Sequence, residues 1–107
     1  MKATRYAWTW EIKPDHVEEY VAMHRSPWPE LQAELSRAGL RNHSIFRWGT
    51  RFFYYAESDD IDVAFAYINN SEVCRKWNGI TSAMVQGSFD FGEAEPIAFL
   101  ESCYYLR

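Results

Sequence analysis

The stretch that most limits the possible folds is R-Y-A-W-T-W-E-I, residues 5–12, in which aromatic and other side chains alternate strictly. Tyr6, Trp8 and Trp10 fall on one face, and polar side chains fall mostly on the other. Successive side chains of a β-strand point to opposite faces of its sheet. The alternation therefore predicts a half-buried strand.

Prolines mark the boundaries of the two helices predicted next. Pro14 opens a helix, and Pro27 ends it because the residue before a proline is disfavoured in helical backbone geometry. Pro29 opens a second helix, which Gly39 is suited to terminate. The apolar stripes of these helices repeat every three or four residues and consist of Val17, Tyr20, Val21 and His24 in the first, and Leu31, Leu35 and Ala38 in the second.

Three further strands are predicted in the remainder of the chain. Residues 40–48 and 51–57 form two of them, and Gly49-Thr50 between them is typical of a hairpin turn. Residues 99–106, F-L-E-S-C-Y-Y-L, are expected to form the closing strand.

Two more helices are predicted between the hairpin and the closing strand. One carries apolar residues from Ile61 to Ile68, and Asn70-Ser71 is a start signal for the other. Residues 86–96 contain two glycines and a proline and predict a loop, either a plain connector or a lid. The stripe of the last helix consists of Val73, Trp77, Ile80 and Met84.

The order β-αα-β-β-αα-β is that of a ferredoxin-like α+β fold, with four antiparallel strands and helices on one face. We expect residues 1–107 to form a single domain. The other sheet face would be rich in aromatic residues, which make up 18% of the chain, and a bare face of this kind is unfavourable. We therefore expect a homodimer in which two sheets pack face to face, a dimeric α/β barrel.

Composition argues against several classes of partner. A net charge of -4 without a basic run disfavours nucleic-acid binding, and no apolar run is long enough to cross a membrane. The N-terminal residues lack the apolar core of a signal peptide. Cys74 and Cys103 are too few and too far apart for a disulfide framework, so free thiols and a cytoplasmic location are expected.

His24 is the main candidate for catalysis. It lies one helical turn after Tyr20, just before the break at 27–29, and imidazole is suited to proton transfer near neutral pH. The alternative is a histidine that only caps the last helical turn. His43, on a predicted strand in phase with Ile45, belongs either to the core edge or to the same cavity, and the spacing of the histidines does not predict a metal site.

Trp77 and Asn78 are candidates for binding a sugar. An indole face stacks on the apolar face of a sugar ring, and amides and histidines bond its hydroxyl groups. Trp77 lies on an apolar helix stripe, however, so a purely structural role in the core is the alternative.

The sequence resembles the L-rhamnose mutarotase family over nearly its whole length. The residues that carry the resemblance are P-D-H-V-E-E-Y-V-A-M-H (14–24), W-P-E-L-Q-A-E-L (28–35), G-L-R-N-H (39–43), C-R-K-W (74–77) and Y-Y-L (104–106). The resemblance implies a dimeric α+β barrel that interconverts sugar anomers without a cofactor or a metal.

By the same resemblance, His24 matches the family's proton donor, Tyr20 a substrate-binding tyrosine, and Trp77 the first of two adjacent tryptophans that contact sugar. This chain departs from the family at two positions, with His43 where a tyrosine is usual and Asn78 in place of the second tryptophan. The resemblance thus implies an isomerase that acts on L-rhamnose or a related sugar such as L-fucose. His24 would protonate the ring oxygen, and Tyr20, His43 or a water would handle the anomeric proton.

Two functions of other classes remain open at this point. One is a cofactor-independent monooxygenase or isomerase of the dimeric α/β barrel type, which an aromatic cavity would also suit. The other is a non-catalytic binding module in which His24 is a helix cap.

Overall fold

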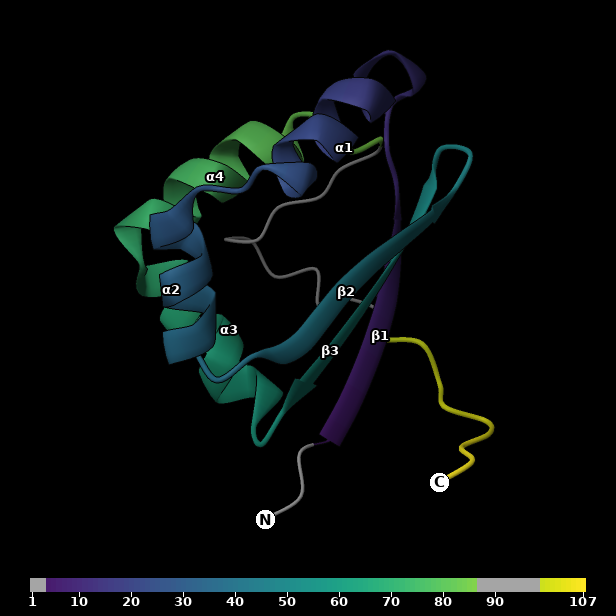
Figure 1. Cartoon of the computed structure of the whole chain (residues 1–107), viewed down its shortest axis with the longest axis vertical. Coiled ribbons are helices and arrows are strands. Elements are labelled where there is room, and N and C mark those ends of the chain that lie inside the picture. The colour runs from purple at the N-terminus through teal and green to yellow at the C-terminus, as the bar shows by residue number, and fades with distance from the viewer. Residues whose placement is uncertain (1–3, 87–98) are drawn as a thin grey trace.

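The computed structural model describes residues 4–86 and 99–107 and consists of a β-sheet with helices on one side (Figure 1). The helices lie over one face of the sheet, and the C-terminal residues leave from its other side (Figure 1). The elements in chain order are β1 (Thr4–Glu11), the 3-10 turn η1 (Pro14–His16), α1 (Val17–Arg25), α2 (Pro29–Arg37), β2 (Arg41–Trp48), β3 (Arg51–Ser58), α3 (Ile61–Asn70) and α4 (Glu72–Ser82).

The described strands form an antiparallel sheet in the order β1-β3-β2. Trp8 of β1 and Ile45 of β2 both lie opposite Tyr54 of the central strand β3. Because side chains alternate along each strand, these three residues share the face that packs against the helices. Phe53, the neighbour of Tyr54, belongs to the opposite, outer face.

The predicted helix boundaries correspond to side-chain and backbone caps. The Asp60 carboxylate accepts hydrogen bonds from backbone N–H groups in the first turn of α3, and the Ser71 hydroxyl accepts one from the N–H of Cys74 in α4. Trp28 is the N-cap of α2, with Pro29 in its first turn. The helix predicted from Pro14 begins as the 3-10 turn η1 and continues as α1.

The core lies between the sheet and the helices and is built around aromatic rings. Trp8 stacks on Tyr54 with an interplanar angle of 5° and meets the edge of Phe65 from α3. Trp77 of α4 is buried here, as its stripe predicts, but Ile80 of the same stripe is 42% exposed, so its predicted burial is wrong. The residue lies far enough around the helix from Trp77 to face solvent.

The prediction of a closing strand over residues 99–106 is wrong. Phe99 forms an isolated bridge with Trp8, and the N–H of Leu100 donates to the carbonyl of Ala7 at 2.7 Å. Beyond Leu100 the chain runs away from β1 (Figure 1). Its side chains instead meet Arg5, whose guanidinium lies 3.9 Å from the ring centroid of Tyr105. Pairing thus stops after the first residues because the following ones make no ladder with the β1 edge.

The loop predicted over residues 86–96 lies, from residue 87 onward, outside the described residues. Gln86 itself donates its backbone N–H to the carbonyl of Glu11 at the end of β1.

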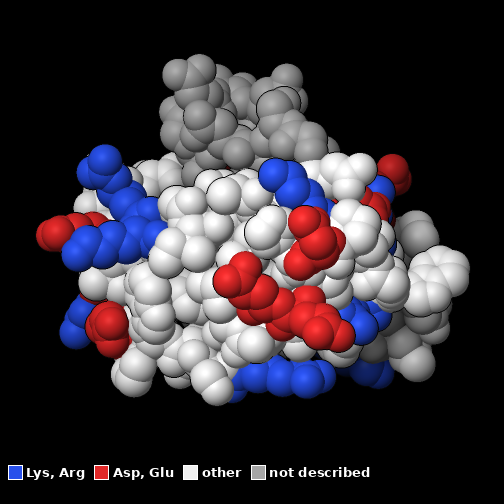
Figure 2. Space-filling model, turned by 90° about the horizontal axis from the view of Figure 1, so that it is seen from above, with Lys and Arg blue, Asp and Glu red and all other residues white. Residues whose placement is uncertain are grey.

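Surface and thiol properties can be compared with the expectations from composition. On the face shown in Figure 2, acidic and basic side chains lie among uncharged ones and no broad basic patch is visible. Cys74 is buried and Cys103 exposed, and both are free thiols. Among the described residues, no helix has the length and apolar character needed to span a membrane.

Candidate active site

His24 is anchored at the end of α1 by its own helix. Its Nδ1 lies 2.7 Å from the carbonyl oxygen of Tyr20, one turn earlier. Because a carbonyl only accepts hydrogen bonds, Nδ1 must carry the proton. In the neutral ring Nε2 is then a free acceptor, and in the imidazolium it holds the proton that can be given away. The bond to a carbonyl is what a helix-capping role predicts, but it leaves Nε2 available for chemistry.

Aromatic rings surround the imidazole of His24. The Tyr20 ring lies at a centroid distance of 4.3 Å, and the Trp77 ring meets the imidazole edge-on at 5.2 Å. Trp28, held between Pro27 and Pro29, packs edge-on against Trp77 at 5.1 Å. The structure therefore brings together three of the predicted site residues, and the proline-bounded break places Trp28 behind them.

Tyr20 is joined to a residue that sequence reasoning missed. Its hydroxyl oxygen lies 2.5 Å from that of Tyr54 on β3, and each tyrosine is only 3% exposed. Burial raises the pKa of Tyr20 to about 12, an effect that the hydrogen bond with Tyr54 opposes, and burial also raises the pKa of Tyr54. The alternation of Phe52, Tyr54 and Ala56 was the available signal for an inward-facing tyrosine.

His43 lies on the sheet side of the same region. Its ring stacks on Trp8 at 5.9 Å, and Trp8 in turn stacks on Tyr54. The Nδ1 of His43 lies 2.9 Å from the carbonyl oxygen of Tyr55, so this nitrogen also carries a proton and Nε2 is the free position. His43 therefore belongs to the aromatic cluster that reaches Tyr20 through Tyr54, rather than to an isolated core edge.

The electrostatic environment favours neutral histidines. Desolvation lowers the pKa of both His24 and His43, and the charge of His43 lowers that of His24 further. Hydrogen bonds to backbone carbonyls act in the opposite direction at both residues. Since charge on one ring disfavours charge on the other, the two imidazoles favour sharing one proton over holding two.

Two polar groups complete the description. Trp8 Nε1 is buried with no hydrogen-bond partner in the part of the chain that the structure describes. Asn78 is half-buried, and its backbone carbonyl accepts a bond from Thr81. No hydrogen bond within residues 4–86 and 99–107 ties the Asn78 side chain to His24 or Tyr20, so the structure does not join this predicted residue to the cluster. Among the same residues, no three histidine, cysteine or acidic side chains are grouped as metal ligands.

Comparisons with known proteins agree with the residues assembled in this cluster. The family model of L-rhamnose mutarotase matches residues 5–106. The L-rhamnose mutarotase of Klebsiella pneumoniae subsp. pneumoniae is 30% identical over 74 residues, which are 68% of this chain and 71% of that protein.

Solved structures show the same architecture. The L-rhamnose mutarotase of Formosa agariphila has a TM-score of 0.74 at 21% identity, over 97% of this chain and 99% of that one. A dimeric ferredoxin-like protein from an uncultured marine organism has a TM-score of 0.60 at 14% identity, over 100% of this chain and 94% of that one. These likenesses confirm the ferredoxin-like α+β class predicted from the order of elements.

The family assignment rests on a match that runs from the first strand to the last residues of the chain and includes the helix carrying Tyr20 and His24. It agrees with the fold and with a curated relative that aligns over two thirds of the chain. The chain therefore belongs to the L-rhamnose mutarotase family and is an isomerase of the class that acts on carbohydrates.

Proposed function

We propose that this protein interconverts the α and β anomers of L-rhamnose or of a related sugar such as L-fucose. The observation that carries the proposal is the anchored imidazole of His24, whose Nδ1 is fixed on the Tyr20 carbonyl while its ring lies between Tyr20 and Trp77. The family to which the chain belongs supports the reaction type.

Mutarotation needs one acid and one base. The base removes the proton of the anomeric hydroxyl, the acid protonates the ring oxygen, and the bond between C1 and the ring oxygen breaks to give an open aldehyde. Rotation about the C1–C2 bond turns the other face of the aldehyde inward, and the reverse proton transfers close the ring as the other anomer. Atoms and protons balance without a further reactant.

In this proposal His24 is the acid and His43 the base. Protonated His24 gives the proton on Nε2 to the ring oxygen, and neutral His43 accepts the anomeric proton on its own Nε2. The carbonyls of Tyr20 and Tyr55 hold the Nδ1 protons throughout. The histidine pair carries one extra proton before and after the step, as the mutual lowering of charge favours.

The remaining predicted residues would bind the sugar. Tyr20 would donate a hydrogen bond to a sugar oxygen, and Trp77 would offer an indole edge or face to the sugar's C–H groups. His43 and Asn78 replace the tyrosine and tryptophan usual in the family and add hydrogen-bonding capacity. This exchange favours a sugar with an additional or differently oriented hydroxyl, for which L-fucose is the candidate.

The test is anomer exchange measured by saturation-transfer NMR for L-rhamnose, L-fucose and common aldoses, at about pH 6 and near neutrality. We expect the wild type to accelerate exchange of one sugar, and His24→Ala to lose about 10²–10⁴-fold of that acceleration with its fold kept. His16→Ala is the matched control, because His16 is a solvated histidine at the start of the same helical segment, paired with Glu19. Wild-type exchange in His24→Ala would refute the assignment of the acid.

The two alternative functions give different results in the same set of assays. Oxygen uptake with a quinol substrate and no effect on sugars would indicate a monooxygenase of this fold. Saturable sugar binding without accelerated exchange would indicate a binding module.

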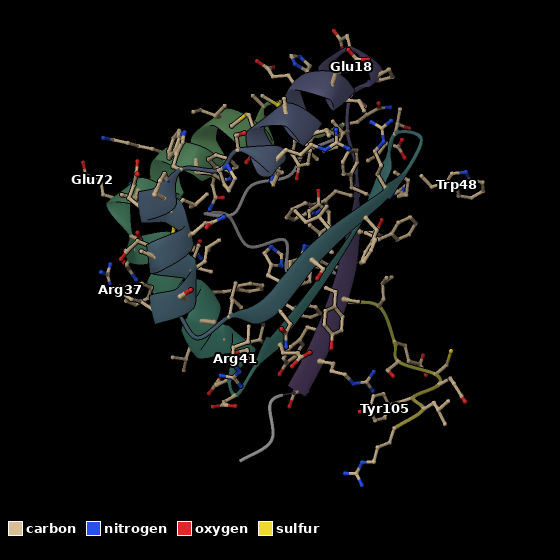
Figure 3. All side chains as sticks on the ribbon, viewed as in Figure 1. Glu18, Arg37, Arg41, Trp48, Glu72 and Tyr105 are labelled. Carbon is tan, nitrogen blue, oxygen red and sulfur yellow. The ribbon has the colours of Figure 1, made fainter. Side chains whose placement is uncertain are left out.

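We also propose that the protein is a homodimer joined through the outer sheet face. Phe53 at the centre of this face is 37% exposed, and Phe46 beside it and Trp48 at the hairpin end are more exposed still. Trp48 and Tyr105 both project on the side of the sheet away from the helices (Figure 3). Apolar exposure of this extent favours a protein partner, and the comparison structure described as dimeric shares the fold. Both cysteines being free is compatible with the proposed cytoplasmic location.

A further inference from the structure

The hydrogen bond between Tyr20 and Tyr54 joins the catalytic helix to the centre of the sheet. Tyr20 comes from α1 and Tyr54 from the central strand β3, and their hydroxyl oxygens are 2.5 Å apart. Both side chains are almost fully buried. The bond therefore connects the residue one turn before His24 to the most constrained strand of the sheet.

The Tyr54 ring is fixed on several sides. It stacks on Trp8 at a centroid distance of 5.7 Å and lies against the edge of Trp10 at 4.7 Å. Tyr20 is bounded by Phe52 on the sheet at 4.9 Å, and on its other side by His24. Tyr54 thus holds its hydroxyl in one place, and Tyr20 is the partner that reaches the imidazole.

Counting protons shows that this pair has one donor to spare. Each phenol has one O–H proton, and a single bond between the two hydroxyls uses only one of them. Within the described residues, neither hydroxyl makes another hydrogen bond to an acceptor of the chain. A buried donor without an acceptor is unfavourable, so two tyrosines in this place need an acceptor from outside the chain.

We propose that Tyr54 is a positioning residue that donates its hydroxyl proton to the Tyr20 oxygen and thereby directs the Tyr20 proton toward a sugar oxygen. A hydroxyl that accepts one hydrogen bond becomes a stronger donor in the next, so the bond also polarises the Tyr20 O–H group. Tyr54 touches no substrate in this arrangement and acts only through Tyr20. The inference rests on the proposed function, because it takes Tyr20 as a sugar ligand.

A double-mutant cycle tests this inference. Tyr54→Phe, Tyr20→Phe and the double variant are compared with wild type for kcat/KM, kcat and KM of anomer exchange on the sugar that the wild type accelerates. Phenylalanine fills the space of each ring, and thermal melting checks that each variant folds. We expect Tyr54→Phe to lower kcat/KM about tenfold, mainly through KM. The double variant should be no worse than Tyr20→Phe alone.

The matched control is Tyr67→Phe. This change removes a hydroxyl that donates to Glu34 on the far side of the helix layer, and it should leave kcat/KM at the wild-type value.

The outcomes separate the two levels of the proposal. An active wild type with an unaffected Tyr54→Phe variant would overturn the role of Tyr54 alone. So would full multiplication of the two single losses in the double variant, because Tyr54 would then act independently of Tyr20. A wild type that accelerates no sugar would overturn the proposed function, and this inference with it.

Discussion

The two faces of the sheet use the same kinds of aromatic side chain in opposite ways. On the inner face, Trp8 and Tyr54 stack on each other, and buried hydroxyls and imidazoles find hydrogen-bond partners. On the outer face, Phe46 and Phe53 lie side by side on paired strands and stay exposed. Aromatic content alone does not distinguish the two faces. The coverage by helices makes one a closed, polar-lined cluster and leaves the other available for a second chain.

Replacing one tryptophan from each side should give the largest contrast. Trp77→Ala removes a buried ring that contacts both His24 and Trp28, and we expect the free energy of unfolding to fall by about 3–5 kcal/mol. Trp48→Ala removes a ring that is 83% exposed, and in dilute protein it should change the same quantity by less than about 0.5 kcal/mol. Urea unfolding followed by circular dichroism measures both. Equal losses would show that the two sides do not differ as described.

A charge placed on the outer face should act on association rather than folding. Phe53→Lys puts an ammonium group at the centre of the proposed interface, so we expect the mass in light scattering to fall from that of two chains to that of one.

Val63→Lys is the control for this substitution, because Val63 is an exposed apolar residue on the helix side, and this variant should keep the mass of the wild type. A Phe53→Lys variant that remains dimeric, or a wild type with the mass of one chain, would contradict the proposed interface.

The smallest expected effect is the dependence of stability on pH. The folded-state pKa values of His24 and His43 are lowered, so the unfolded chain binds protons more readily than the folded one as the pH falls below about 6.5. The contribution of these residues to stability is therefore present above that pH and is lost below it. We expect the melting temperature to drop between about pH 7.5 and pH 5, and to drop less in a His24→Phe variant. An equal drop in both would place the effect on other groups.

Local patterns predicted most of the elements, for reasons visible in particular residues. The alternation around Trp8 corresponds to β1, and the start signals at Asp60 and Ser71 act as N-caps through their side chains. The four-residue spacing of Tyr20 and His24 on one helix suffices to place their rings together, as a centroid distance of 4.3 Å confirms. Such features depend on neighbours within a few residues, which a sequence pattern records.

Contacts between distant segments were less predictable. The partnership of Tyr20 with Tyr54 depends on how α1 lies over the sheet and on the register of β3, neither of which the alternation specifies. The closing strand had a suitable composition, but pairing with the β1 edge ends at Leu100. Ile80 fits the apolar spacing of α4 and still faces solvent, because the width of the covered stripe depends on the neighbouring elements.

The sequence by itself determined the identity and order of the helices and strands and the placement of Tyr20 and His24 on one helical face, since backbone periodicity and capping act over a few residues. The tertiary structure alone decided that Tyr54 reaches Tyr20, that His43 stacks on Trp8, and which aromatic rings remain exposed. These outcomes depend on strand register and on helix packing over the sheet. Both are set by burial summed over many residues distant in the chain, so no single segment specifies them.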